Sequence, residues 1–199
     1  MHTVFLDLDQ TCIAGVTPEE LMTMEGVDES LPRHELLNED GDVDYYIFER
    51  PGLQKFLTKL FSDRNVESVN VWTAASAPYA TFIAKNILRC EEEGRRLGVL
   101  LHADHCSVSS ETKVECSLGC HRGQKHLCML THHWKLPGCK SPIIFDDNKK
   151  VYQKSFNKGR AIQVDEFYPN KDDSEHLERA YEKFQKYITD KILNEDTQE

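Results

Sequence analysis

The chain has 199 residues, 39% of them hydrophobic and 29% charged, a composition that suits one globular domain and excludes a disordered or mainly membrane-spanning chain. Its 34 acidic residues outnumber its 24 basic ones, so the net charge is −10. This excess argues against nucleic acid or an anionic membrane surface as a partner, because both require a cationic footprint. The chain opens without a secretory leader and has seven cysteines, an odd number, so we expect free thiols and an intracellular protein of the nucleus or cytoplasm.

Apolar runs and helical periodicity alternate along the chain. Residues 4–8 predict a buried strand, and Thr17 and Glu20 form a capping box that starts a short helix at Pro18. Later segments with strand composition are 43–48, 66–72, 142–145 and 161–164. Segments with one apolar helical face are 53–61, 78–90 and 174–194. The alternation predicts an α/β fold with a parallel, Rossmann-like sheet flanked by helices.

We expect a single domain over residues 1–194 and a disordered tail at 195–199. Residues 90–120 interrupt the pattern and are expected to be an insertion rich in histidine and cysteine. Candidate zinc ligands in this region are His102, His105, Cys106, Cys116, Cys120 and His121. Their spacing lacks the CxxC pairs of strong zinc sites, so a polar insertion with free, buried cysteines is the preferred interpretation.

Two acidic pairs each follow an apolar strand. Asp7 and Asp9 lie two residues apart at the end of the first strand, where alternation would place their side chains on one face, and Asp146 and Asp147 end the strand at 142–145. Because the carboxyl ends of parallel strands meet at one edge of a sheet, we expect all four carboxylates to converge there. Such carboxylates repel one another unless a hard cation lies between them, and Mg²⁺ suits oxygen ligands best. The alternative is a set of solvated acids at strand ends.

The segment Asp7-Leu8-Asp9-Gln10-Thr11 resembles the DxDxT signature of haloacid dehalogenase superfamily phosphatases. Within that superfamily the chain is most similar to the small phosphatases of the RNA polymerase II C-terminal domain, also called NLI-interacting-factor-like. Further segments resemble motifs of this family in the same order, at residues 41–56, 71–80, 120–127 and 144–148. The resemblance covers residues 4 to about 165 and implies a small β-hairpin insertion without a large cap domain.

The resemblance also implies chemical roles at the two ends of the first motif. Asp7 would be the nucleophile that forms an aspartyl-phosphate. Asp9 would protonate the leaving oxygen and later deprotonate water, while its backbone carbonyl holds the metal. Asp147 matches the family's direct metal ligand and Asp146 its neighbour that supports lysine and metal. A slip of one residue would exchange these two, so Asp7, Asp9, Asp146 and Asp147 form the expected Mg²⁺ site together.

Thr73 and Lys125 match the family residues that bind the phosphoryl oxygens. Thr73 has an alternative role as the cap of the following helix, and Lys125 has rivals in Lys135 and Lys140, which lie nearer the last motif. The stretch from Arg50 to Gly52 is expected to start a helix rather than to contact substrate.

The expected function is that of a Mg²⁺-dependent phosphoserine or phosphothreonine protein phosphatase. Its partner would be a phosphorylated protein segment, with the RNA polymerase II C-terminal tail as a candidate substrate. An open site without a large lid favours a protein segment over a small molecule. Two alternatives stay open: a small phosphatase for phosphotyrosine or sugar phosphates, and a non-catalytic scaffold that binds phosphopeptides. The helix at 18–25 and the run Asn148-Lys149-Lys150 depart from the family pattern, so substrate preference is not carried over.

Overall fold

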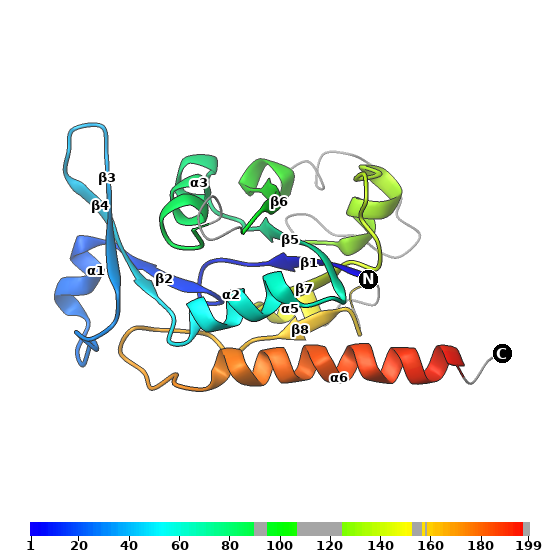
Figure 1. Ribbon diagram of the computed structural model, residues 1–199. Helices are drawn as coiled ribbons and strands as arrows, with labels where there is room; N and C mark the ends of the chain where they lie inside the picture. Colours follow the sequence, from blue (N-terminus) through cyan, green and yellow to red (C-terminus); the bar gives the residue numbers. More distant parts are fainter. Residues whose placement is uncertain (90–94, 107–124, 153–156, 158, 197–199) are drawn as a thin grey trace.

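The computed structural model describes residues 1–89, 95–106, 125–152, 157 and 159–196. Within these ranges, five parallel strands form one sheet and three antiparallel strands form a second, smaller one (Figure 1). The strand order of the large sheet is β6-β5-β1-β7-β8. This arrangement confirms the predicted α/β fold with a parallel sheet.

The large sheet is built around β1 (His2–Leu6), which pairs with β5 (Val66–Trp72) on one side and β7 (Ile143–Asp146) on the other. Val4, Phe5 and Leu6 are completely buried, as expected for a central parallel strand covered on both faces. The outer strands are β6 (Leu97–Leu101) and β8 (Ala161–Gln163). Because β1 and β7 are parallel neighbours, the residues that follow them emerge at the same edge of the sheet.

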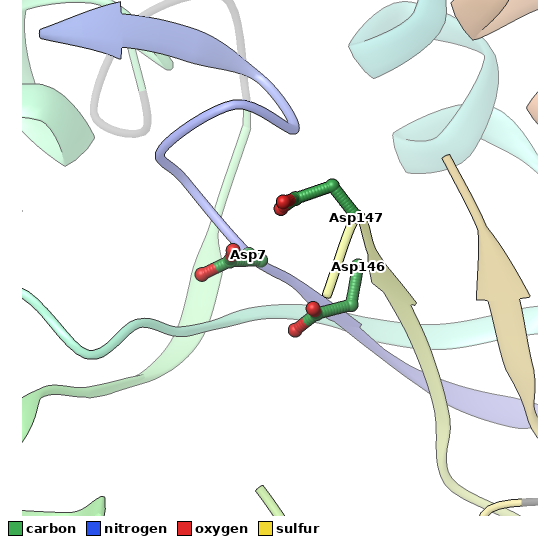
Figure 2. A group of neighbouring side chains, drawn as sticks. All are labelled: Asp7, Asp146 and Asp147. Carbon is green, nitrogen blue, oxygen red and sulfur yellow. The ribbon is translucent and has the colours of Figure 1, made fainter. Parts of the chain in front are cut away.

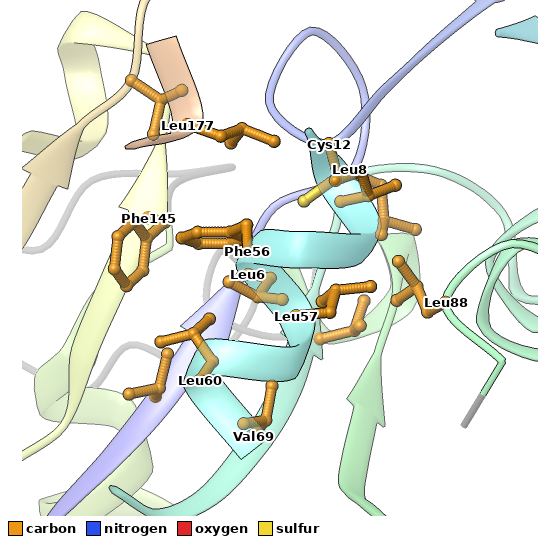
Figure 3. Packing of buried hydrophobic residues seen from close by; sticks show 14 of the residues in the cluster. Leu6, Leu8, Cys12, Phe56, Leu57, Leu60, Val69, Leu88, Phe145 and Leu177 are labelled. Carbon is orange, nitrogen blue, oxygen red and sulfur yellow. The ribbon is translucent and has the colours of Figure 1, made fainter. Parts of the chain in front are cut away.

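Helices cover one face of this sheet. They are α2 (Leu53–Ser62), α3 (Ala77–Asn86) and α6 (His176–Asp196), and their apolar residues join Leu6, Val69 and Phe145 in one core cluster (Figure 3). Phe56, Leu57 and Leu60 of α2 lie on one helical face and are buried there. Among the described residues, no helix combines the length and the apolar composition needed to span a membrane.

The opposite face carries shorter elements. Residues 103–106, the π-helical turn η1 (Met129–His133) and the short helix α5 (Lys149–Tyr152) lie on this side. Their buried residues, including Cys106, Leu127, Leu130 and Val151, form a second cluster with Phe5, Trp72 and Ile144. The alternation of side chains along a strand explains this division, because Leu6 faces one cluster and Phe5 the other.

The predicted hairpin insertion is a three-stranded sheet with one helix. Between β1 and α2 the chain forms β2 (Ile13–Val16), α1 (Pro18–Thr23), β3 (Arg33–Leu37) and β4 (Val43–Glu49), with strand order β2-β4-β3. Thr17 caps α1 through the predicted capping box with Glu20. The sequence indicated only polar turns where β3 lies, because this edge strand buries almost no side chain.

Several predicted boundaries shift. The helix expected to reach Cys90 ends at Asn86, and Arg89 adopts a left-handed backbone conformation with φ of 52°. β6 lies inside the segment expected to be an insertion, and the C-terminal helix continues to Asp196. Residues 90–94, 107–124 and 197–199 lie outside the described ranges, so the domain boundaries, the insertion and the tail stay predictions.

Candidate active site

The carboxyl edge of the large sheet brings the two acidic segments together. Leu6 is paired with Phe145 across β1 and β7, and the backbone N–H of Asp7 donates to the carbonyl oxygen of Phe145 at 3.0 Å. Asp7, Asp146 and Asp147 each offer one carboxylate oxygen, and these three oxygens lie within 4.8 Å of one another. Figure 2 shows the three side chains at the ends of the two strands. Sequence spacing alone had predicted this convergence.

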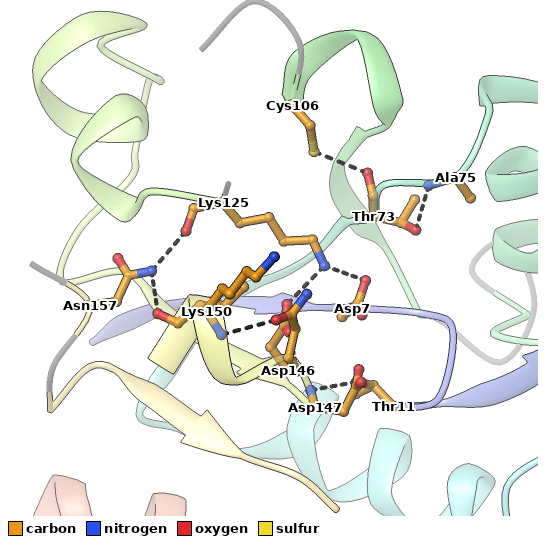
Figure 4. A network of polar contacts seen from close by, with 12 residues as sticks. Asp7, Thr11, Thr73, Ala75, Cys106, Lys125, Asp146, Asp147, Lys150 and Asn157 are labelled. Carbon is orange, nitrogen blue, oxygen red and sulfur yellow. Dashed lines mark hydrogen bonds and ion pairs between the residues drawn. The ribbon is translucent and has the colours of Figure 1, made fainter. Parts of the chain in front are cut away.

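Lys125 lies among these acids. Its Nζ atom lies 2.8 Å from Oδ2 of Asp146 and also forms an ion pair with Asp7 (Figure 4). Burial alone would lower the pKa of Lys125, but the two neighbouring carboxylates raise it above its ordinary value. The side chain is therefore a fixed ammonium group. Lys135 and Lys140, the alternative candidates, are exposed and do not line the pocket at this edge.

Asn157 anchors the backbone that carries Lys125. Its Nδ2 group donates to the carbonyl oxygens of Lys125 at 2.7 Å and Val151 at 3.0 Å, and its Oδ1 atom accepts from the N–H of Leu127 at 3.0 Å. The Asn157 side chain is completely buried. Sequence reasoning missed this residue, because a single asparagine 32 positions from the lysine carries no motif.

Thr11 holds Asp147 in place through two hydrogen bonds. Its hydroxyl donates to Oδ1 of Asp147 at 2.9 Å and accepts from the Asp147 backbone N–H at 3.1 Å. Burial, and then the charge of Asp7, raise the pKa of Asp147 to about 6. The same two causes raise the pKa of Asp146. Both shifts reflect first the loss of hydration on burial and then the repulsion by Asp7, and a bound cation would offset both effects.

Asp9 lies apart from the other three carboxylates. The strand ends at Leu6 and Gln10 turns the chain with φ of 56°, so the side-chain alternation that predicted convergence does not extend to Asp9. Its Oδ1 atom instead accepts a hydrogen bond from the Tyr79 hydroxyl at 2.7 Å. The pKa of Asp9 is raised to about 6. Burial is the main cause, the charge of Asp7 raises the pKa further, and the hydrogen bond from Tyr79 lowers it in part. The two acids of the first motif thus have different environments.

A pocket of about 290 Å³ opens over this edge. The predicted site residues that line it are Asp7, Asp9, Thr73, Lys125 and Asp147. Asp146 is completely buried and reaches the pocket only through its contact with Lys125. Thr73 follows β5 directly, and its Oγ1 atom accepts from the N–H of Ala75 at 3.1 Å. The N-cap of α3 is Ser76, so the alternative role of Thr73 as that cap is not the one observed.

A second depression continues from the first. Its volume is about 500 Å³, and it shares Asp9 and Gln10 with the pocket. Its other lining residues come from the insertion and from the start of α3, and they include Leu36, Leu37, Tyr45, Pro78 and Tyr79. The site therefore extends as a groove, which we call the insertion groove, along the small sheet.

Arg50 ties the first motif to the C-terminal part of the chain. Its Nη1 group donates to the carbonyl oxygens of Thr11 at 2.8 Å and Gln10 at 3.3 Å, and its guanidinium binds Asp173 through two bonds of 2.5 and 2.7 Å. The side chain is 1% exposed and does not line the pocket. The expected helix does start here, at Leu53 after Gly52. The buried ion pair was not predicted, because its two partners are 123 residues apart in the sequence.

The candidate zinc ligands lie only partly within the described residues. His102 and His105 contact each other, with the His102 backbone N–H 3.1 Å from Nδ1 of His105, and the Cys106 thiol donates to the carbonyl oxygen of Thr73 at 3.5 Å. Cys116, Cys120 and His121 fall in the range 107–124, outside the description. In the described ranges, the group suited to a metal consists of the three aspartates.

Comparison with known proteins gives consistent matches. The model of the NLI interacting factor-like phosphatase family matches residues 2–194. The chain is 31% identical over 179 residues to the CTD phosphatase-like protein 355R of Invertebrate iridescent virus 6, covering 88% of this chain and 91% of that protein. The corresponding protein of Invertebrate iridescent virus 3 is 32% identical over 153 residues, which are 74% of this chain and 75% of that protein.

Two solved structures share the fold. Fcp1, an essential RNA polymerase II CTD phosphatase, matches with a TM-score of 0.52 and 24% identity over 84% of this chain. A variant of fission yeast Fcp1 bound to beryllium fluoride matches with a TM-score of 0.54 and 23% identity over 94% of this chain. The chain spans 42% and 50% of these two solved chains, respectively.

The buried Arg50–Asp173 pair should be essential for stability. Asp173→Ala leaves the guanidinium buried without its carboxylate, and we expect the free energy of unfolding to fall by about 3–5 kcal/mol. Urea denaturation followed by circular dichroism measures this change. Glu175→Ala is the matched control, because that exposed carboxylate lies 4.0 Å from Arg179 and its loss should change the free energy by less than about 0.5 kcal/mol. Equal effects of the two variants would contradict the prediction.

Proposed function

The chain belongs to the NLI interacting factor-like phosphatase family, and on that premise we propose that it hydrolyses phosphoserine or phosphothreonine in protein segments, with Asp7 as nucleophile and Mg²⁺ as cofactor. Membership of the family makes the chain a phosphatase and confirms the resemblance drawn from its motifs. The observation that carries the finer proposal is the placement of Asp7. It lies in an open pocket, against a buried ammonium group and beside two further carboxylates.

In the first half of the proposed reaction, a carboxylate oxygen of Asp7 attacks phosphorus and the bond from phosphorus to the serine or threonine oxygen breaks. The leaving oxygen takes a proton from Asp9, so the peptide departs as a neutral alcohol. Lys125 and Thr73 would bind the phosphoryl oxygens, where negative charge develops. The products of this half are the dephosphorylated segment and an aspartyl-phosphate at Asp7.

In the second half, Asp9 accepts a proton from a water molecule whose oxygen attacks phosphorus. The bond between phosphorus and the Asp7 oxygen breaks, inorganic phosphate leaves, and Asp7 returns to a carboxylate. Asp9 ends each cycle protonated, ready to serve again as the acid. Its pKa of about 6 supports this double role, because both protonation states are accessible near neutral pH.

The three clustered carboxylates fit a hard divalent cation. One oxygen of each lies within 4.8 Å of the other two, and carboxylate oxygens are the donors that Mg²⁺ prefers. Three carboxylates face one ammonium group, which leaves two negative charges for such an ion to balance. Asp7, Asp147 and the backbone carbonyl of Asp9 would hold it, with Asp146 in support. When bound, the ion supplies positive charge that offsets repulsion between the incoming phosphate and these acids.

The shape of the site supports a protein segment as substrate. The insertion groove continues from the pocket past Asp9 and is lined by apolar side chains such as Leu36, Leu37 and Pro78. A lone sugar phosphate would leave this groove empty, whereas residues flanking a phosphoserine could occupy it. The named relatives are CTD phosphatase-like, so the C-terminal tail of RNA polymerase II is the substrate we propose, with the nucleus or cytoplasm as the location.

A substrate panel tests this proposal. We expect kcat/KM on phosphoserine and phosphothreonine peptides, polymerase tail repeats among them, to exceed that on sugar phosphates by at least about tenfold, since only the peptides gain contacts in the groove. Release of inorganic phosphate with Mg²⁺ present is the measurement, and phosphotyrosine versions of the same peptides are included. Preference for a sugar phosphate or for phosphotyrosine would favour the alternative function, and binding without hydrolysis would favour a scaffold.

The two acids of the first motif should be indispensable. Asp7→Asn removes the nucleophile and Asp9→Asn removes the proton carrier, so each should lower kcat on p-nitrophenyl phosphate by at least about a thousandfold. Asp190→Asn, an exposed position on α6, should keep wild-type activity. Removing divalent cations with EDTA should likewise abolish the wild-type activity, and added Mg²⁺ should restore it. Full activity of Asp7→Asn would refute the mechanism.

Lys125 should be distinguished from its two rivals by the same assay. Lys125→Met removes the charge next to Asp7 and should lower kcat/KM by about a hundredfold or more. Lys135→Met and Lys140→Met change exposed positions away from the pocket and should stay within about twofold of wild type. Thermal unfolding of all three variants separates lost activity from lost fold. A large loss of kcat/KM in Lys135→Met or Lys140→Met, with Lys125→Met still active, would assign phosphate binding to that other lysine.

A further inference from the structure

We infer that Tyr79 is a positioning residue that orients the carboxyl group of Asp9 for proton transfer, and that Gly15 provides the space it needs. The inference rests on the function proposed for Asp9. The inference concerns the orientation of the Asp9 carboxyl group. It gives a role to Tyr79 and Gly15, neither of which is among the residues proposed to bind the phosphoryl group.

Asp9 needs an external anchor. It lies in the loop after β1, one residue before the left-handed Gln10, so no regular element fixes the direction of its side chain. Among the described residues, the hydrogen bond to its carboxyl group comes from the Tyr79 hydroxyl, at 2.7 Å on Oδ1. Because Oδ1 accepts this bond, the transferable proton belongs on Oδ2. The bond therefore selects one oxygen of Asp9 for proton transfer.

Tyr79 itself is firmly held. It lies in the first turn of α3, its side chain is 8% exposed, and its ring packs edge-on against Tyr45 of β4 with a centroid distance of 5.3 Å. A buried phenol normally needs a partner for its hydroxyl, and here that partner is Asp9. Tyr79 and Asp9 both line the insertion groove, so the residue that positions the acid also lies where flanking substrate residues would bind.

Gly15 explains how the hydroxyl reaches Asp9. A methyl group at this position of β2 would overlap the Tyr79 hydroxyl and would lie 3.2 Å from Cζ of Tyr79 and 3.6 Å from Oδ1 of Asp9. Gly15 is not among the described glycines with positive φ, so its backbone does not require glycine. The position requires the absence of a side chain, because Tyr79 occupies the space. The insertion thus provides both the space, through β2, and the ring contact, through β4.

The test uses leaving groups of different basicity. Phenyl phosphate releases a basic oxygen that needs a proton, whereas 2,4-dinitrophenyl phosphate releases a stable anion that does not. Tyr79→Phe should lower kcat/KM for phenyl phosphate by about tenfold to a hundredfold, and for the dinitrophenyl ester by less than about threefold, because only the first reaction depends on a well-placed acid.

Two further variants complete the experiment. Gly15→Ala keeps Tyr79 but displaces its hydroxyl, and it should reproduce the selective loss on phenyl phosphate. Tyr181→Phe is the matched control, because Tyr181 donates a comparable bond of 2.9 Å to Asp63 on the covered side of α6; it should leave both substrates unaffected. Thermal unfolding is measured for each variant.

The possible results separate the inference from the function on which it rests. An equal loss on both esters, or no loss on either, overturns the positioning role while the phosphatase mechanism stands. Wild-type protein that hydrolyses neither ester in the presence of Mg²⁺ refutes the proposed mechanism, and the inference fails with it. A loss confined to phenyl phosphate in both Tyr79→Phe and Gly15→Ala supports the inference.

Discussion

The ion pairs of Lys125 with Asp7 and Asp146 are the interaction on which the rest of the site depends. Three carboxylates at one sheet edge are a liability for folding, because burial disfavours each charge and the charges repel one another. A buried ammonium group makes the cluster tolerable, and the remaining negative charge leaves room for a divalent cation. The same lysine lines the pocket, so the group that stabilises the carboxylate cluster is also suited to bind an anionic substrate.

The charged cluster is held by neutral and remote groups. Asn157 fixes the backbone of Lys125, Thr11 fixes Asp147, and Arg50 binds the carbonyl oxygens of the loop that contains Thr11. Each of these three residues is at least 99% buried, and each side chain forms hydrogen bonds with the backbone. Because every anchor comes from a different part of the chain, the geometry of the site is a property of the complete fold rather than of any one motif.

The sequence was most informative where local pattern determines structure. Apolar runs identified β1 and β7, and an imperfect alternation of valines with polar residues identified β5. The acids at the ends of β1 and β7 indicated the sheet edge where the site lies. Three described strands were not predicted: β2 is only four residues long, β3 is a polar edge strand, and β6 lies next to a segment dominated by histidine and cysteine. Arg50 and Asn157 could not be found, because their partners lie 123 and 32 residues away and one sequence holds no record of such contacts.

Asp7 and Asp9 illustrate how environment assigns different chemistry to two identical side chains. Asp7, the proposed nucleophile, forms an ion pair with the buried ammonium group of Lys125. Asp9 is partly desolvated, and burial raises its pKa although the hydrogen bond from Tyr79 opposes the shift, which suits the proton carrier that we propose. Because β1 ends at Leu6 and the chain turns at Gln10, Asp9 lies outside the strand, and its carboxyl group accepts a hydrogen bond from Tyr79 of α3. A straight continuation of β1 would have placed both acidic side chains on one face of the sheet, without the separate contact that Asp9 makes with Tyr79.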